Sequence, residues 1–217
     1  MAEQVGANSV KELREKTGAG IMDCKRALEA AGNDVEKAIT WLREKGLASA
    51  AKKAGRVASE GQIVQYIHPG GRVGVLLELN CETDFVARTE QFQQLARDLT
   101  MQIAAGAPRW LAREDVPADV VEAERAVLSK QAQGEGKPER IVANIVEGRL
   151  KKFFQENCLL EQPFIKDDSR TVTQLVQEAI SRLGENIVPR RFARFGLGEV
   201  GAEGIEASAP VPQGAGR

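Results

Sequence analysis

The sequence predicts an α+β fold in which an N-terminal module of three helices precedes an α+β core with a small antiparallel sheet and a projecting helical hairpin. Three observations support this prediction. Helical patterns with caps and breakers fill residues 9–46, two β-rich runs flank a short turn near residue 70, and two helical patterns follow one another within about 117–157. We expect a module at 1–50, a linker at 51–60, a core at 61–197 and a disordered tail at 198–217.

The module is expected to hold three short helices separated by tight turns. The TGAG sequence ends the first helix, and the second is predicted from about Ile21 to Ala31. Two pairs of residues have the spacing of a capping box and predict the starts of the first and third helices: Ser9 with Glu12, and Asn33 with Glu36.

A methionine is expected on the exposed face of the second helix. Met22 falls among charged side chains there, and its neighbour Ile21 falls on the apolar stripe. Partial shelter against the TGAG turn is one interpretation of Met22, and a flexible contact with a partner is the other. The stripe itself is predicted to contain Ile21, Cys24, Ala27, Leu28 and Ala31.

A charged connection and a β-hairpin follow the module. Residues 47–60 are rich in Ala and Lys and have few large apolar side chains, which favours a helical arm or linker. The runs GQIVQYI and RVGVLLELN, joined by HPGG, predict a hairpin with His68 in its turn. His68 is typical of a turn residue, although a tight turn also exposes the imidazole to any partner.

An aromatic residue stands beside a carboxylate at the end of the second run, in the sequence NCETDFVARTEQF. From Thr89 to about Ala105 the apolar spacing predicts a helix with Phe92 on its buried stripe. Phe85 lies before that stripe, at a strand-to-helix junction that can hold a ring outward. Composition alone predicts that Phe85 is either a core residue or a partner contact.

The rest of the core is expected to contain two long helical arms, one further helix and one strand. The arms within about 117–157 are interrupted by QGEGKP and predict an antiparallel hairpin. After the extended QPFIKD, a helix is predicted at Thr171 to Leu183, and PRRFARFGLGE predicts a strand that can join the first hairpin. The tail is rich in Gly, Ala, Glu and Pro, which predicts disorder.

Composition excludes several classes of partner. There are 30 Lys and Arg against 31 Asp and Glu, so the net charge of -1 gives no general electrostatic reason to bind nucleic acid or a membrane surface. The 3 cysteines lack CxxC spacing and fit reduced, buried thiols. The N-terminus has no apolar leader. No apolar run is as long as the roughly 20 residues that a membrane span needs, so we expect a cytoplasmic protein.

No motif in the sequence predicts catalysis, a cofactor or a metal site. One histidine excludes a His-based metal cluster within one chain, and GAGIMDCK lacks the GK[ST] of a phosphate loop. A Ser nucleophile without a GxSxG setting, or Cys81 paired with His68, is only weakly supported. Three basic clusters are better interpreted as solvated faces than as phosphate contacts. These are Lys52, Lys53 and Arg56; Lys151 and Lys152; and Arg190, Arg191 and Arg194.

The sequence resembles the bacterial elongation factor Ts family in three segments: VKELREKTGAGIMDCKRALEAAGNDVEKAITWLREKG, NCETDFVAR and VEGRLKKFFQENCLLEQPFIKD. The match covers roughly residues 8–200 in family order. It implies a non-enzymatic guanine-nucleotide exchange factor for elongation factor Tu, the GTPase that carries aminoacyl-tRNA to the ribosome. Such a factor binds elongation factor Tu·GDP, promotes GDP release by disturbing the Mg²⁺ and phosphate site, and remains bound until GTP binds.

The resemblance also implies residues for each contact. The module would be similar to ubiquitin-associated domains and would dock on the nucleotide domain of the GTPase through Arg14, Ile21 and Met22. His68 would contact a different domain, and the helical hairpin matches the family's coiled-coil projection. The residues that would displace Mg²⁺ from the GTPase are Thr83, Asp84, Phe85 and Val86. Phe85 would be wedged between two helices of the GTPase.

The sequence departs from the longer family members in one important respect. They carry a duplicated core, whereas one hairpin here carries both the His68 turn and the Thr83–Val86 segment. The short form implies a homodimer and leaves open which protomer's His68 meets which partner domain. Ile21 replaces the Met that commonly precedes Met22, a volume-conserving change. A module that binds polypeptides through the helices similar to ubiquitin-associated domains remains the alternative function.

Overall fold

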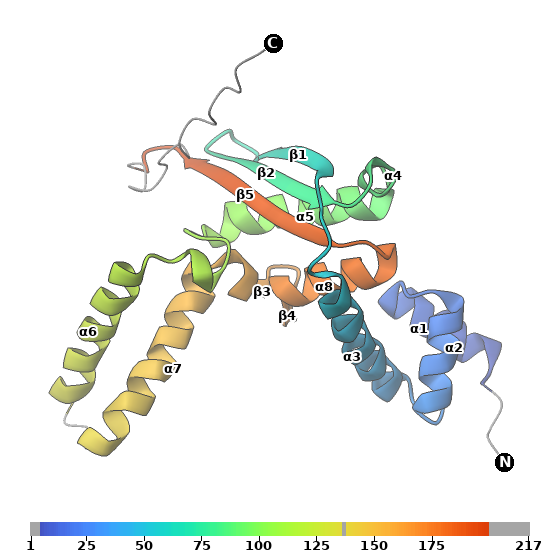
Figure 1. The fold of residues 1–217 in the computed structure, drawn as a ribbon, viewed down its shortest axis with the longest axis horizontal. Coiled ribbons are helices and arrows are strands. Elements are labelled where there is room, and N and C mark those ends of the chain that lie inside the picture. Colours follow the sequence, from blue (N-terminus) through green and yellow to red (C-terminus); the bar gives the residue numbers. More distant parts are fainter. Residues whose placement is uncertain (1–4, 136–137, 200–217) are drawn as a thin grey trace, which may run out of the picture.

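A three-stranded antiparallel sheet with helices on one face forms the centre of the protein (Figure 1). The computed structural model describes residues 5–135 and 138–199, so nearly all of the predicted disordered tail at 198–217 lies outside the described residues. The strand order is β1–β2–β5, which confirms that the third strand joins the hairpin and that the fold class is α+β. The strands are β1 (Glu60–Ile67), β2 (Val73–Cys81) and β5 (Ile187–Gly196).

The main core lies between the inner face of this sheet and two helices, α5 (Glu90–Gly106) and α8 (Val172–Leu183). Alternate residues of β2 point into it, because successive side chains of a strand lie on opposite faces. The predicted stripe of α5 is buried, including Phe92. Its buried side chains include Val75, Leu77 and Leu79 of β2, Phe92, Leu95, Leu99 and Ile103 of α5, and Val172, Val176 and Ile180 of α8.

The module folds around a separate small core. Its helices are α1 (Ala7–Thr17), α2 (Ile21–Ala30) and α3 (Val35–Lys53). Helix α3 packs along α8, with Ser181 beside Gly46, and it runs to Lys53, so the predicted linker at 51–60 begins as helix. The buried residues of the module are Leu13, Cys24, Ala27, Leu28 and Ala38.

Both predicted capping boxes of the module are wrong. Helix α1 begins at Ala7, two residues before Ser9, and its N-cap Gly6 supplies no side-chain bond. Helix α3 is capped by Asp34, whose Oδ1 accepts a hydrogen bond from the Lys37 backbone N–H at 3.1 Å. Asn33 has a left-handed φ of 65° and completes the preceding turn, so it cannot take the extended backbone of an N-cap.

The helical hairpin projects from the core on the side away from the module (Figure 1). Its arms are α6 (Ala118–Gly134) and α7 (Glu139–Asn157), and they enclose an apolar cluster of their own. Backbone bonds fix its base, because Arg109 and Trp110 donate to the carbonyl of Asn157 and Leu159 donates to that of Trp110. None of the described helices is long and apolar enough to cross a membrane.

Two buried glutamines join α5 to the segment after the hairpin. Gln102 Nε2 donates to Gln162 Oε1 at 3.0 Å, and Gln162 Nε2 donates to the carbonyl of Gly106 at 3.0 Å. Buried amides are costly unless hydrogen-bonded, so this pair fixes the register of the segment. The segment contains short elements that the sequence predicted only as extended chain: η2 (Leu159–Glu161), β3 (Pro163–Phe164) and β4 (Asp167–Thr171); η1 (Arg113–Asp115) precedes the hairpin.

Gly106 is expected to be intolerant of a side chain. A Cβ atom there would lie 2.5 Å from Gln162 Oε1, so Gly106→Ala should lower the free energy of unfolding by about 1–3 kcal/mol. Gly148→Ala is the matched control, because a Cβ in the middle of α7 meets no atom within 4 Å and should stabilise by about 0.5–1 kcal/mol. Urea denaturation measures both, and a Gly106→Ala protein as stable as wild type would contradict the prediction.

Candidate partner-binding surface

A four-residue helix, α4 (Asp84–Ala87), connects β2 to α5 and carries Phe85. Isolated helices of this length are unstable, because one turn fixes several dihedral angles for very few hydrogen bonds. Side chains therefore cap both of its ends. Thr83 Oγ1 accepts from the Val86 backbone N–H at 3.4 Å, and the Thr89 hydroxyl donates to the Val86 carbonyl at 2.7 Å.

The carboxylate of Glu185 holds the N-terminal side of α4. Its Oε2 accepts hydrogen bonds from the backbone N–H groups of Glu82 and Thr83 at 3.1 and 3.0 Å. Its Oε1 accepts from the Thr83 hydroxyl at 2.6 Å. Hydrogen bonds to a charged acceptor are stronger than neutral ones, so these three bonds fix the junction to the turn that follows α8.

The C-terminal half of α4 packs inward and leaves Phe85 outward. Ala87 is buried, Val86 packs against the main core, and Gln62 Nε2 donates to the Ala87 carbonyl at 2.9 Å. Phe85 is 79% exposed, which decides between the two interpretations of its sequence: it is not a core residue. Asp84 lies beside it on the same helix and forms an ion pair with Arg88 at 2.7 Å.

The first turn of α2 presents two exposed apolar side chains. Met22 is 63% exposed, as its helical position predicted. Ile21 is 56% exposed, so its predicted place in the buried stripe is wrong. The buried residues of α2 begin at Cys24, whereas Ile21 is the first residue of the helix, directly after the TGAG turn.

Charged contacts fix α2 to α3 next to these residues. Asp23 Oδ1 accepts from Lys45 Nζ at 2.9 Å and from Arg26 at 2.8 Å. The Lys45 ammonium holds the pKa of Asp23 below its usual range. Arg14 is exposed and lines a cleft of about 830 Å³ between the module and α8, whereas Ile21 and Met22 do not line it.

His68 lies at the other end of β2. It is exposed in the hairpin turn, where its Nδ1 is 3.0 Å from the Tyr66 hydroxyl and its backbone N–H donates to the Val73 carbonyl. Strand β2 runs for 9 residues from Val73 to Cys81, which at about 3.4 Å per step places its ends about 27 Å apart. Cys81 is also buried, which raises the pKa of its thiol. The weakly supported Cys81–His68 pair is therefore wrong.

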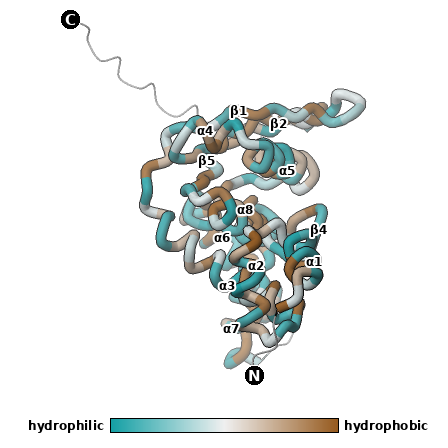
Figure 2. The backbone as a smooth tube through the Cα atoms, turned by 90° about the vertical axis from the view of Figure 1, so that its right-hand side faces the viewer, coloured by the Kyte–Doolittle hydropathy of each residue, from teal (hydrophilic) through white to brown (hydrophobic). Residues whose placement is uncertain are grey.

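The structure brings two of the three predicted contact sites to one side. Helix α4 and helices α1 and α2 lie on the same side of the molecule, which faces the viewer in Figure 2. The His68 turn lies at the opposite end of the sheet from α4. The surface formed by α4 with the first turn of α2 is called the Phe85 side below.

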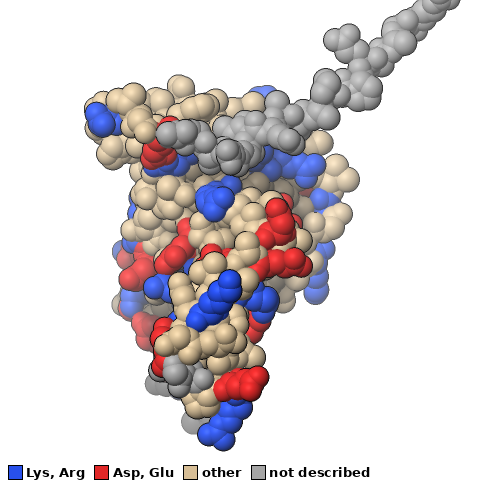
Figure 3. Space-filling model, turned by 90° about the vertical axis from the view of Figure 1, so that its left-hand side faces the viewer, with Lys and Arg blue, Asp and Glu red and all other residues tan. Residues whose placement is uncertain are grey.

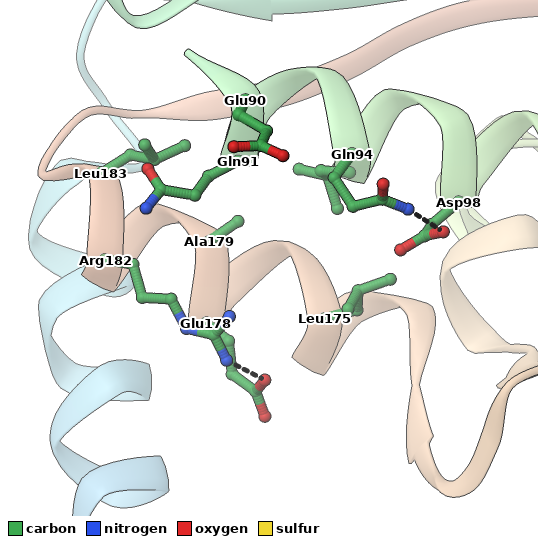
Figure 4. Close-up of a pocket in the computed structure, with 10 residues that line it drawn as sticks. Glu90, Gln91, Gln94, Asp98, Leu175, Glu178, Ala179, Arg182 and Leu183 are labelled. Carbon is green, nitrogen blue, oxygen red and sulfur yellow. Dashed lines mark hydrogen bonds and ion pairs between the residues drawn. The ribbon is translucent and has the colours of Figure 1, made fainter. Parts of the chain in front are cut away.

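A pocket of about 280 Å³ between α5 and α8 is lined by no Ser, Thr, Cys, Lys or His side chain (Figure 4). Gln94 donates to Asp98 at 2.8 Å, and Arg182 donates to Glu178 at 3.4 Å. The carboxylates of Asp98 and Glu178 are thus each bonded to a neighbouring side chain. Within residues 5–135 and 138–199, no group of three or more His, Cys, Asp or Glu is arranged to hold a metal ion.

Charge does not separate into large patches on the side that bears the hairpin. Figure 3 shows acidic and basic side chains mixed there. Several residues of the predicted basic clusters are paired with carboxylates: Arg191 with Glu78 at 2.6 Å and Arg56 with Glu82 at 3.5 Å. These pairs support the interpretation of the clusters as solvated faces.

Comparison with known proteins assigns the chain to a family. The family model described as elongation factor TS matches residues 2–199. The chain belongs to the elongation factor Ts family. Elongation factor Ts of Moorella thermoacetica is 61% identical over 195 residues, which cover 90% of this chain and 96% of that protein. The Thermoanaerobacter pseudethanolicus protein is 60% identical over 204 residues, or 94% and 98% of the two chains.

Membership of the elongation factor Ts family confirms the resemblance and gives the chain a role in translation elongation. It does not reveal the residues that support the Phe85 side. Sequence reasoning missed Glu185, Asn186 and Gln62, which hold α4 or its surroundings from other elements. No local pattern marks them, because their partners lie far away in the sequence.

Stability should fall in alkaline solution because of a buried thiol at the base of the hairpin. Burial raises the pKa of Cys158 from 9.0 to about 11, so the folded state favours the thiol over the thiolate. The contribution of this buried thiol to the free energy of unfolding is complete below about pH 9 and is lost as the pH rises through about 11. Urea denaturation between about pH 8 and about pH 10 should show a smaller decrease for Cys158→Ala than for wild type; equal decreases would contradict the assignment.

Proposed function

We propose that the protein is the guanine-nucleotide exchange factor of elongation factor Tu, acting in the cytoplasm without a cofactor or covalent chemistry. It would bind the GDP form, promote GDP release by disturbing the Mg²⁺ and phosphate site, and remain bound until GTP enters. The observation that carries this proposal is Phe85, an exposed aromatic ring on a helix fixed at both ends. Family membership supports the same function.

The four residues of the Mg²⁺-dislocating segment would divide into two roles. Asp84 and Phe85 would contact the GTPase, since Phe85 projects into solvent and Asp84 lies beside it. Thr83 and Val86 would position them, since the Thr83 hydroxyl is engaged with Glu185 and Val86 packs on the core. An exposed ring on a supported helix suits insertion between two helices of a partner.

The module would provide the second attachment. We propose that residues 1–50 resemble ubiquitin-associated domains and dock on the nucleotide domain through Arg14, Ile21 and Met22. The exposure of Ile21 and Met22 supports this role better than a place in the core would. Residues 51–60 would link the module to the core at 61–197, and His68 would contact a different domain of the GTPase.

The energetics allow Phe85 to provide a large share of the effect. Any factor by which the protein weakens GDP binding must be returned by GDP on the protein, because coupling is reciprocal. A weakening of about a thousandfold corresponds to about 4 kcal/mol. Burial of a Phe side chain supplies roughly 1.5–3 kcal/mol, so the docking surfaces and disturbed Mg²⁺ contacts would supply the remainder.

Phe85→Ala tests the proposal directly. It should slow GDP release from elongation factor Tu by about 10-fold to about 150-fold relative to wild type, as loss of roughly 1.5–3 kcal/mol requires. Its thermal stability should not change, because the ring is exposed. Release of labelled GDP measures the rate, and Val127→Ala, an exposed apolar residue on the hairpin, is the matched control.

Two outcomes would count against this mechanism. If wild type and Phe85→Ala accelerate release equally, Phe85 is not the inserted residue. If neither accelerates release, the exchange function itself fails. Peptide binding by the module would then support the alternative function of binding polypeptides.

We also propose a homodimer formed through the outer face of the sheet. No described helix covers this face, which is opposite α5 and α8 (Figure 1). The register places Gly74 opposite both Ile67 and Phe195, and Leu76 opposite Ala193, so these side chains share the outer face. Ile63, Ile67, Leu76 and Phe195 are between 48 and 71% exposed. These apolar side chains, with the Arg191–Glu78 ion pair among them, form an uncovered face that suits a second copy of the same chain.

Ile63→Glu should dissociate this dimer. A charge on the outer face would be buried without a partner in the dimer, so sedimentation equilibrium should give a monomer for this variant and a dimer for wild type. Val57→Glu is the control, because Val57 is exposed but precedes β1 and lies outside the face. A monomeric wild type, or a dimer that Ile63→Glu leaves intact, would overturn the proposal.

A further inference from the structure

The turn at 184–186 contacts the start of α4 and the connection that leads from the module to β1. Gly184 ends α8 in the left-handed conformation, with φ 79°, and Glu185 and Asn186 follow before β5. Glu185 faces the start of α4, as described above, through three hydrogen bonds to Glu82 and Thr83. Asn186 faces the chain that leaves the module.

Asn186 binds the connection between α3 and β1. Its side-chain amide Nδ2 donates to the carbonyls of Ala54 and Arg56, at 3.4 and 2.9 Å. The side chain is 3% exposed, so these bonds are made away from solvent and are costly to lose. Asn80 of β2 adds a bond from its Nδ2 to the Ala58 carbonyl at 3.3 Å.

Glu82 links the turn at 184–186 to the connection between α3 and β1. Its Oε1 accepts from the Asn186 backbone N–H at 2.6 Å and lies 3.5 Å from the Arg56 guanidinium. The residue before Thr83 is thus bonded to the turn at 184–186 and ion-paired with the connection from the module. Residues separated by more than 100 positions in the sequence meet here.

We propose that Glu185 and Asn186 act as positioning residues that fix Phe85 and the module in one frame, so that both engage the GTPase together. This inference rests on the proposed exchange function. A binding site on two separately moving parts loses conformational freedom when it binds, whereas a preorganised site does not. The bonds of the 184–186 turn remove that freedom before the partner arrives.

The first test measures, in the absence of the GTPase, how firmly Glu185 holds residues 82–87. Amide hydrogen exchange at 82–87 should become at least about tenfold faster in Glu185→Ala, whereas exchange in the middle of β2 should not change. Glu185→Gln, which retains an acceptor oxygen, should restore part of the protection. Glu161→Ala is the matched control, since it removes a carboxylate bound to Arg113 at the base of the hairpin. Unchanged exchange at 82–87 in Glu185→Ala would overturn the proposal.

The second test separates positioning from general stability. Glu185→Ala should lower the maximal rate of GDP release from elongation factor Tu by about fivefold or more, and it should raise the dissociation constant of the nucleotide-free complex, because the lost order must be restored on binding. Because Glu185 acts through Phe85, the double variant with Phe85→Ala should be no slower than Phe85→Ala alone. Additive losses would overturn the proposal. If the wild-type protein does not accelerate GDP release from elongation factor Tu, the exchange function itself fails. Hydrogen exchange alone then decides whether Glu185 positions α4.

Discussion

The burial of β2 is the constraint on which the other elements depend. It pairs with β1 on one side and β5 on the other, and its inner residues lie beneath α5 and α8. One of its ends carries the His68 turn and the other carries α4, so a strand of fixed length sets the distance between them. Contacts of a partner with both ends must therefore span about 27 Å.

Local patterns predicted the elements well and their surroundings poorly. The stripe of α5 and the outward position of Phe85 followed from helical spacing, which depends only on neighbouring residues. Ile21 was misplaced because spacing cannot tell whether a partner lies opposite the first turn of α2. Glu185 escaped prediction because its bonds to Thr83 cross 102 residues, and nothing in the GEN sequence at 184–186 indicates a distant partner.

Exposed apolar residues in this protein are supported by polar contacts behind them. Phe85 projects from a helix whose backbone is held by Glu185, Gln62 and two threonine caps. On the outer face of the sheet, Arg191 and Glu78 pair across β5 and β2 among the apolar residues. Such contacts use hydrogen bonds and charges to fix side chains that gain nothing from burial in the isolated chain. The exposed rings thus remain available for another molecule.

Under the proposed exchange function, reciprocal coupling would make rigidity matter more at α4 than at the module. For the proposed exchange reaction, contacts that are equally good with and without GDP bind the partner but shift nothing, because a ligand shifts an equilibrium only by its differential affinity. The proposed docking by Met22 and its neighbours would belong to that class wherever the bound surface stays unchanged. In the proposed mechanism, coupling would arise where Phe85 and nucleotide compete for the partner's conformation. A mobile Phe85 would yield to the GDP-bound partner, whereas one fixed on α4 would make the partner yield instead.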